Sequence, residues 1–400
     1  MTKKLYFDDP MTTEFTAQIV GIRRDERTST KLSERGFGVI LPSTFFYPTS
    51  GGQSNDTGTI GSARVVDVFA DGDDIVHLLD KELEVGSYPA KIDWDRRFAN
   101  MQHHSGQHIF SAVFWHELGL ETLSSHISGE APSTIDFDKT SLSAKEIALV
   151  EKKANQIIFE NREMKAYFVE NKDSVDFRRP PKVDREIRVI EIDGYDYSAC
   201  GGTHVPQTGM VGMLKIIRTE RINKKVRIHF VAGWQALAYF GKVQNAASET
   251  AAMLAVGVDG LHETVVSLQK QLKSAEKELK SLREIALDVE VSKMVQHAEE
   301  VDGNWVLTKL FENRNPAELR SMAMKLRVYP NMVTILASFD GKKLSLVTSC
   351  ADGTGVSAND LLQKHLAPFE GRGGGDKSVA QGGGATDDIG DIFKNTAKMI

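Results

Sequence analysis

Two short clusters of metal-binding residue types stand about ninety residues apart in this chain. The first is His104-Ser-Gly-Gln-His108 and the second is Cys200-Gly-Gly-Thr-His204. Together they offer three imidazoles and one thiolate, a set of borderline and soft donors that suits tetrahedral Zn²⁺. The sequence therefore predicts one zinc ion per chain, bound by His104, His108, Cys200 and His204.

Local geometry explains how each cluster can form half of such a site. Residues four positions apart lie on one face of a helix, so His104 and His108 can direct their rings at the same ion. The two glycines after Cys200 permit a tight turn that brings a thiolate and an imidazole together. Four protein ligands are typical of a structural site, whereas a catalytic site keeps or frees one position. The spacing leaves both alternatives open.

Composition limits the classes of protein to consider. The chain has 400 residues, of which 41% are apolar and 26% are charged, as in a globular protein of several domains. No apolar run has the length of a signal peptide or a membrane span, so we expect a cytoplasmic protein. Only Cys200 and Cys350 are present, too few for a disulfide framework. The net charge is −6, so any binding of nucleic acid requires local basic patches.

The pattern of apolar and turn residues predicts an α+β multidomain protein. Residues 1–93 contain short alternating strands between glycine and aspartate turns, which indicates a small β-barrel. Residues 94–238 begin with a helix that carries the first metal cluster. A second helix starts at a capping box, Ser143-Ala-Lys-Glu146, and strands follow, including a hairpin of 213–217 with 226–231. We expect this second part to be a two-layer α/β domain that binds zinc.

The remaining residues predict a long helix and a further domain. Apolar residues from Leu261 to Ala286 repeat at alternating spacings of four and three, and lysine and glutamate lie between them. Residues 239–303 are therefore a predicted coiled-coil linker, which can join two chains or pair with a helix of its own chain. Residues 304–400 are a predicted C-terminal α/β domain with a glycine-rich tail, Gly371 to Gly384. A homodimer can form through either part.

The ordered set of motifs resembles the editing region of alanyl-tRNA synthetases and the free-standing AlaX-type editing proteins in their long form. The loop from Phe46 to Gly58 is similar to the glycine-rich loop of this family. The two metal clusters match its zinc motifs, and the tail from Gly371 to Gly384 is similar to the glycine-rich segment of the synthetase C-terminal domain. We find no P-loop and no GxGxxG motif, and we expect no class II activation domain ahead of residue 1, so we expect no amino-acid activation by this chain alone.

The resemblance implies hydrolysis of the ester that joins a wrong amino acid to the 3′-terminal adenosine of tRNA(Ala). A pocket for alanine cannot strongly reject serine, which adds only a hydroxyl, so a second, hydrolytic site is needed. Serine is the expected target and glycine the second. The zinc ion can activate water, polarise the ester carbonyl or anchor the amino group, and the sequence does not choose between these roles.

Polar residues near the predicted zinc site are candidates for contact with the substrate. Gln107 and Thr203 are the candidate catalytic residues, because each lies within a metal cluster and can position water or the ester. A partner for the serine hydroxyl is expected from residues 124–134 or from the loop 47–56. The candidate substrate-binding residues are Tyr47, Gly51, Gly52, Gln53, Asp56, Ser125 and Thr134.

Basic residues around the predicted hairpin indicate contact with the phosphates of tRNA(Ala). The C-terminal domain would bind the same tRNA away from the ester, which adds affinity by linking two sites. A second basic run can extend the first and consists of Lys172, Arg178, Arg179, Lys182, Arg185 and Arg188. The candidate RNA-binding residues are Lys215, Arg218, Arg221, Lys224, Lys225 and Arg227, with Arg372 and Lys377 in the C-terminal domain.

Other functions fit the same residues. The chain can be a non-catalytic, zinc-stabilised tRNA-binding protein, or a detached synthetase module that assists aminoacylation in trans. A phosphoesterase with a similar glycine-rich tail would need an Asp-His-His cluster, and the sequence contains none.

Overall fold

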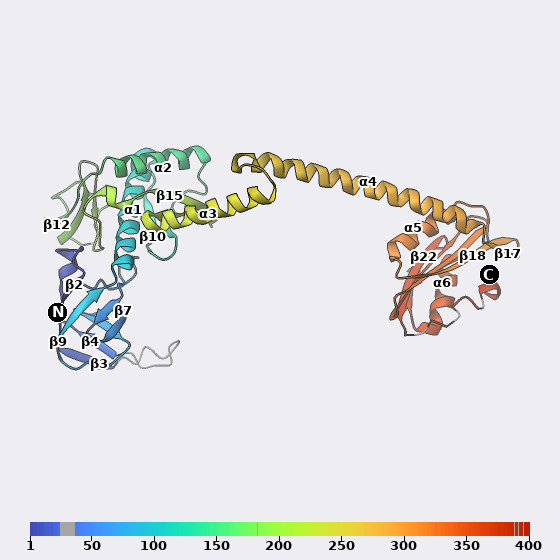
Figure 1. Ribbon diagram of the computed structural model, residues 1–400, viewed down its shortest axis with the longest axis horizontal. Coiled ribbons are helices and arrows are strands. Elements are labelled where there is room, and N and C mark those ends of the chain that lie inside the picture. Colours follow the sequence, from blue (N-terminus) through green and yellow to red (C-terminus); the bar gives the residue numbers. More distant parts are fainter. Residues whose placement is uncertain (25–36, 182, 388, 391, 395) are drawn as a thin grey trace. The chain divides into compact units, whose positions relative to one another are not determined.

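The computed structural model describes residues 1–24, 37–181, 183–387, 389, 390, 392–394 and 396–400 (Figure 1). Lys182, a member of the second basic run, lies outside these residues. The chain divides into two compact units, Met1–Met253 and Leu254–Ile400. The predicted domains 1–93 and 94–238 both fall within the first unit, and the boundaries of the four-part division stay a prediction. Among the described helices, none alone is long and apolar enough to cross a membrane, although the helical segments Gly233–Met253 and Val258–Val295 pass together as a bent pair on length and composition.

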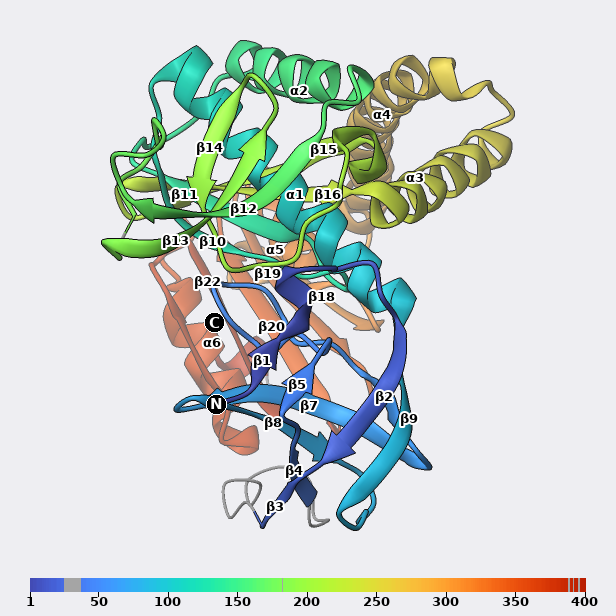
Figure 2. The ribbon, with the colours of Figure 1, turned by 90° about the vertical axis from the view of Figure 1, so that its left-hand side faces the viewer.

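The first unit begins with a curved antiparallel sheet of seven strands, shown in Figure 2. Its two edge strands are consecutive in the chain and only Val20 separates them, so the sheet curls into a half-barrel. The predicted barrel is therefore seen as a half-barrel sheet. The strand order is β2 (Glu14–Ile19), β9 (Gly86–Ile92), β6 (Gly58–Ile60), β7 (Ala63–Asp71), β8 (Asp74–Leu79), β4 (Phe37–Ile40) and β3 (Gly21–Arg24), and the short strands β1 (Lys3–Lys4) and β5 (Ser43–Thr44) pair separately.

Helix α1 (Trp94–Leu118) follows β9 directly and carries the first metal cluster. Asp93 caps its start by accepting a hydrogen bond from the backbone N–H of Arg96, and Gly119 ends it in the left-handed conformation, with φ of 66°. Helix α2 (Ala144–Phe159) packs against α1. Its predicted capping box is confirmed, because the Ser143 and Glu146 side chains each accept from the backbone N–H of the other residue.

Two further antiparallel sheets share a hydrophobic core with α1. One has the order β10 (Thr122–His126), β11 (Ser133–Phe137), β16 (Lys225–Ala232) and β15 (Leu214–Ile222), so the predicted hairpin is confirmed and is longer than expected. The other consists of β12 (Met164–Asn171), β13 (Arg185–Ile192) and β14 (Asp196–Ala199). A shared core of fully buried side chains, including Phe110, Ile135 and Phe230, joins the helix to these sheets. Helix α3 (Gly233–Met253) follows β16.

The second unit contains the long helix α4 (Leu261–Val295) and one six-stranded sheet. The core contains the last turns of α4, where Leu287, Val291 and Met294 are buried. The earlier seam residues Leu272 and Leu282 are 62% and 56% exposed. The sheet order is β17 (Glu299–Val301), β18 (Asn304–Glu312), β19 (Met332–Phe339), β20 (Lys343–Cys350), β22 (Val379–Ala385) and β21 (Arg372–Gly375), with helices α5 (Pro316–Leu326) and α6 (Ala358–Leu366).

The glycine-rich tail forms the paired strands β21 and β22. A Cβ atom on Gly373 would lie 2.5 Å from the Cα atom of Gly382 and 2.9 Å from the side chain of Leu362 on α6. Only glycine permits this close approach. The repeated glycines of the tail therefore have a packing role.

Candidate metal centre

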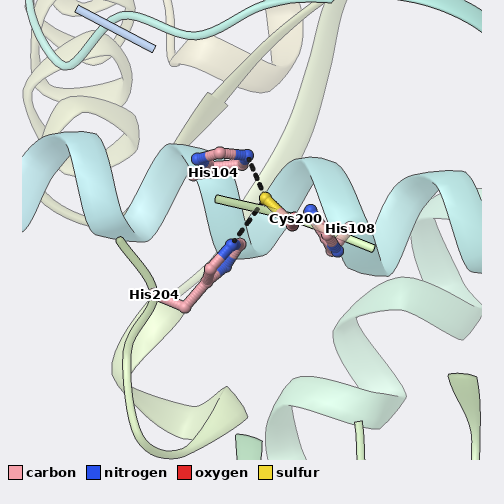
Figure 3. A group of neighbouring side chains, drawn as sticks. All are labelled: His104, His108, Cys200 and His204. Atoms are coloured by element: carbon pink, nitrogen blue, oxygen red, sulfur yellow. Dashed lines mark hydrogen bonds between the residues drawn. The ribbon is translucent and has the colours of Figure 1, made fainter. Parts of the chain in front are cut away.

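The structure brings the two metal clusters together, as Figure 3 shows. The candidate ligand atoms of His104, His108, Cys200 and His204 all lie within 4.8 Å of one another. The Cys200 Sγ atom is 3.4 Å from Nε2 of His104 and 3.4 Å from Nε2 of His204. Helix α1 supplies two of the side chains, and the turn after β14 supplies the other two. Residues far apart in the chain thus form one candidate metal site.

The geometry of this site fits a zinc ion. Usual Zn–N and Zn–S bond lengths in a tetrahedron place a nitrogen and a sulfur ligand roughly 3.6 Å apart. The two separations from the Cys200 sulfur are close to that distance. In addition, Nδ1 of His108 is buried and has no hydrogen-bond partner among the described residues, so one polar atom of the cluster is left unsatisfied there.

Neighbouring polar groups hold the imidazoles in place. Nδ1 of His104 is 2.7 Å from the side-chain oxygen of Gln53, and Nδ1 of His204 is 3.2 Å from the hydroxyl of Ser105. In both rings Nε2 is the atom that faces Cys200. Such contacts to the second ring nitrogen are usual for histidines that bind metals, because they orient the ring and set its tautomer.

The turn that carries Cys200 and His204 is fixed from two sides. Arg188 on β13 donates from Nη1 to the carbonyl oxygens of Cys200 and Gly202, at 3.0 and 2.9 Å. A Cβ atom on Gly202 would lie 2.1 Å from Cε1 of His104. Glycine is therefore required at position 202, because any side chain would collide with a candidate ligand.

Burial changes the acid–base properties of all four groups. It lowers the pKa of His104 to about 3, and the positive charge of Arg188 adds to this effect. The pKa values of His108 and His204 are also well below the usual range, chiefly because of burial. Burial raises the pKa of the Cys200 thiol, which the N–H of Gly202 and the charge of Arg188 partly oppose. The imidazoles are thus in the neutral form that binds metal, whereas the thiol must release its proton on binding.

A cavity of about 500 Å³ opens beside these residues. His104, His108 and Cys200 form part of its wall. Arg178 is held there by hydrogen bonds to Asp196 and Ser198, at 2.9 and 2.8 Å. The wall also includes Gly51, Gln107, Thr122, Ser124, Ser125, Arg179, Pro180, Pro181, Arg188, Ser198 and Gly201. The cavity therefore offers hydroxyls and guanidinium groups next to the candidate metal site.

Three of the predicted substrate or catalytic residues line this cavity, namely Gly51, Gln107 and Ser125. The side-chain amide of Gln107 donates to the Ser111 hydroxyl at 2.6 Å. This bond leaves the carbonyl oxygen of Gln107 as a group that can accept a hydrogen bond from water or substrate. The segment Thr122–Ser125, at the edge of its sheet, adds three hydroxyls to the wall.

Six other predicted residues do not line this cavity, and contact of these six with a substrate stays a prediction. They are Tyr47, Gly52, Gln53, Asp56, Thr134 and Thr203.

Each of these six makes contacts elsewhere in the first unit. Thr203 is fully buried and accepts a hydrogen bond from the Gln53 amide at 2.8 Å. The hydroxyl of Tyr47 donates to the Ser50 carbonyl oxygen at 3.2 Å, within the half-barrel core. Asp56 is paired with the buried Arg97. Gly52 packs against β10. Thr134, in β11, pairs with residues of β10 and β16. Tertiary packing accounts for these positions, and local sequence could not reveal it.

The predicted basic patch on the β15–β16 hairpin is partly neutralised. Lys215 pairs with Glu151 of α2, and Arg227 forms a two-point contact with Asp136 of β11. These carboxylates come from other elements, so the hairpin sequence did not reveal them. In the described part of the chain no carboxylate partner is found for the exposed residues Arg221, Lys224 and Lys225. Arg372 and Lys377 are exposed in the second unit.

Sequence reasoning misses two residues that support the site. The sequence places Arg188 in a basic run for RNA, but this residue holds the turn of Cys200 through two carbonyl oxygens. Ser105 bonds both to His204 and to the backbone N–H of Val205, at 3.2 and 3.1 Å. The position of Ser105 within the first cluster is the only sequence signal for it. For Arg188, nothing in the neighbouring sequence distinguishes an arginine that binds backbone carbonyl oxygens from a charged surface residue.

Three family models match parts of the chain. Residues 187–228, which include Cys200 and His204, match the threonyl and alanyl tRNA synthetase second additional domain. Residues 2–96, which span the half-barrel sheet, match the class II (A) tRNA synthetases. Residues 302–400 match the DHHA1 domain.

Known proteins with similar sequences include alanine–tRNA ligases. The enzyme of Archaeoglobus fulgidus is 32% identical over 404 residues, which cover 95% of this chain and 42% of that protein. The enzyme of Ignicoccus hospitalis is 33% identical over 317 residues, which cover 76% of this chain and 33% of that protein. The chain thus spans less than half of the length of these curated relatives.

Among solved structures, the C-Ala domain of Aquifex aeolicus alanyl-tRNA synthetase matches with 27% identity and a TM-score of 0.24, covering 26% of this chain and 96% of that one.

The matches to the family models follow one another along the chain and cover the half-barrel, the candidate metal turn and the second unit. The chain therefore belongs to the alanyl-tRNA synthetase-like proteins and carries the additional domain associated with editing.

Proposed function

We propose that this chain is a trans-editing hydrolase that removes a wrong amino acid from tRNA(Ala). The ester at the 3′-terminal adenosine is the bond cleaved, and serine is the main target, with glycine second. The observation that carries the proposal is the cavity, whose wall contains three of the four candidate metal ligands beside several hydroxyls and arginines. The names of the relatives support tRNA(Ala) as the RNA partner.

The polar wall suits an aminoacyl ester. A zinc ion held by His104, His108, Cys200 and His204 would supply a positive centre that lowers the pKa of nearby water or polarises a carbonyl group. Gln107 can orient a water molecule or the ester through its free carbonyl oxygen. Arg188 places positive charge on the wall, which favours the anionic end of an RNA, whereas the charge of Arg178 is paired with Asp196. The wall thus provides groups for the ester and for the RNA on which it is carried.

Hydrolysis of the serine ester but not of the alanine ester requires a polar contact with the serine hydroxyl. A site built to bind a hydroxyl rejects an analogue that lacks it, because the buried polar groups of the site then remain unpaired. Thr122, Ser124 and Ser125 are the hydroxyl residues of β10 on the cavity wall. We infer that this segment contacts the serine hydroxyl and spares Ala-tRNA(Ala).

The direct test is incubation of the zinc-loaded protein with Ser-tRNA(Ala), Gly-tRNA(Ala) and Ala-tRNA(Ala), with loss of each ester followed over time. We expect rapid loss of the serine ester, slower loss of the glycine ester, and an intact alanine ester. Chelator-treated protein is the control. Retention of all three esters by fully loaded protein would overturn the proposal. Binding of tRNA without turnover would favour a non-catalytic binding protein, and faster charging by a separate synthetase would favour an assisting module.

We propose that the second unit adds affinity for the same tRNA, because binding at two linked sites raises the effective concentration at each. Removal of residues 304–400 should therefore raise the KM for Ser-tRNA(Ala) more than it lowers kcat. An unchanged KM would remove this part of the proposal.

A further inference from the structure

Gln53 lies between the half-barrel and the two metal clusters, and its side chain is fully buried. It ends a tight turn in which Gly51 and Gly52 have positive φ angles of 57° and 87°. The backbone of this turn is fixed just after the end of β10, because the N–H of Ile127 donates to the Gly52 carbonyl oxygen at 2.7 Å. The turn therefore delivers one amide side chain to the interior of the candidate metal site.

The hydrogen bonds of Gln53 define which way its amide points. The backbone N–H of Thr203 lies 3.2 Å from the side-chain oxygen, and the side-chain nitrogen lies 2.8 Å from the Thr203 hydroxyl. The reversed amide would place its NH₂ group against the N–H of Thr203, two donors facing each other. The carbonyl oxygen must therefore face that backbone N–H.

The same oxygen lies 2.7 Å from Nδ1 of His104. Since a carbonyl oxygen can only accept, Nδ1 of His104 must carry the ring proton. The other nitrogen, Nε2, is then unprotonated, and it faces the Cys200 sulfur at 3.4 Å. The contacts of Gln53 thus leave a lone pair of His104 directed at the centre of the four candidate ligands.

We infer that Gln53 is a positioning residue of the metal centre, which fixes the tautomer and the orientation of His104. Through Thr203 it also ties the turn of Cys200 and His204 to helix α1. This inference rests on the proposed function only in taking the four residues as a metal site, and the contact of Gln53 with a substrate stays a separate prediction. It makes the half-barrel segment a part of the metal centre.

Substitutions at Gln53 test the inference through metal affinity. Gln53→Met keeps a similar volume but cannot accept the hydrogen bonds, and we expect zinc affinity to fall about 10- to 100-fold, the usual effect of losing such a partner. Gln53→Glu keeps an acceptor for His104 and for the Thr203 N–H, and the Thr203 hydroxyl can turn to donate. We expect this variant to bind zinc within about threefold of the unaltered protein, since a carboxylate is an equivalent partner.

Ser54→Ala is the matched control, because Ser54 is the next residue of the loop and bonds to the Ile127 carbonyl oxygen at 3.5 Å. Zinc affinity is measured by competition with a chelating dye, and circular dichroism checks that each variant is folded. A Gln53→Met protein that binds zinc as tightly as the Ser54→Ala control would overturn the inference.

A second measurement uses the unaltered, zinc-loaded protein. Long-range ¹H–¹⁵N spectra of histidine-labelled protein distinguish the two ring nitrogens, and we expect His104 to carry its proton on Nδ1. A proton on Nε2 would refute the inference even if the Gln53→Met variant fails to fold. Loss of the proposed deacylase activity, with the expected order of zinc affinities intact, would instead count against the proposed function alone.

Discussion

Asp56 and Arg97 form an ion pair in which neither side chain is exposed to solvent. Arg97 lies on α1, and it also donates to the carbonyl oxygens of Pro10 and Phe45, at 2.7 and 2.5 Å. Asp56 belongs to the loop that contains Gln53, and it accepts from the backbone N–H of Tyr47 at 2.6 Å. This pair therefore joins the half-barrel to the helix that carries two of the candidate metal ligands.

Asp56→Asn should destabilise the first unit strongly. The substitution leaves the Arg97 charge buried without a counter-charge, which typically costs about 3–5 kcal/mol of the free energy of unfolding. Urea denaturation followed by circular dichroism measures the loss. Asp95→Asn, at an exposed position in the first turn of α1, is the control and should lose well under about 1 kcal/mol. Equal losses for the two variants would contradict the role of the buried pair.

His77 should titrate far below the usual range for histidine. It is fully buried in the half-barrel, its ring lies 2.9 Å from the Thr44 hydroxyl, and burial lowers its pKa to about 4. The unfolded chain binds this proton near pH 6.5, so stability is lost as the pH falls from about 6.5 towards 4 and is unaffected above that window. The chemical shift of the His77 ring, followed by NMR against pH, tests this. A midpoint near pH 6.5 would show that the ring is accessible to solvent.

Cys200→Ala should lower zinc content and deacylase activity together, because it removes the one thiolate of the candidate site. Zinc per chain is measured by atomic absorption, and activity with Ser-tRNA(Ala). Cys350→Ala is the matched control, since Cys350 is a buried cysteine of the second unit and is not one of the four clustered side chains. Full activity of Cys200→Ala without bound metal would refute any part for the ion in catalysis.

Neutralising the tip of the β15–β16 hairpin should weaken tRNA binding. We expect the triple change of Arg221, Lys224 and Lys225 to alanine to lower affinity. It should also make the slope of log affinity against log salt shallower, by about one for each phosphate that the variant no longer binds. Lys215→Ala is the control, because Glu151 already pairs with that lysine at 2.6 Å. Filter binding at several salt concentrations distinguishes the two. The same slope for both variants would place the tRNA elsewhere.

The exposed seam of α4 predicts association of two chains. Leu268 and Leu279 are 44% and 50% exposed, and a heptad seam is stable when a second helix covers it. Leu272→Glu should then shift the sedimentation equilibrium towards monomer, whereas Lys273→Glu, at the next position, should change it little. Monomeric unaltered protein would contradict the association of two chains through this seam.

The parts of the molecule that the sequence predicts well are those with local causes. His104 and His108 are one helical turn apart, and the capping box of α2 is contained in four residues. The positions of Thr203 and Tyr47 depend instead on tertiary packing, which places both in the interior. Strand β14 has only four residues and gives no periodic signal.

The same reason applies to the basic patch, whose contact with RNA stays a prediction. A run of lysine and arginine is visible in sequence, but the carboxylates that neutralise it come from α2 and β11. The support of the metal centre is equally non-local, since Gln53 and Thr203 are 150 positions apart. The candidate ligands can be identified from their spacing in the sequence. The residues that orient them can be identified only from the three-dimensional structure.

The separation along the chain of the residues around the metal centre has a consequence for biosynthesis. His104 and Cys200 are 96 positions apart, and Gln53 precedes both. A nascent segment that ends before the cysteine turn can hold an ion through only two imidazoles, so it binds weakly and exchanges quickly. Closing such a long loop is slow and comes late in folding. In the proposed zinc protein, capture of the ion at full affinity would therefore require a chain that extends past His204, and retained zinc would report that the two clusters have come together.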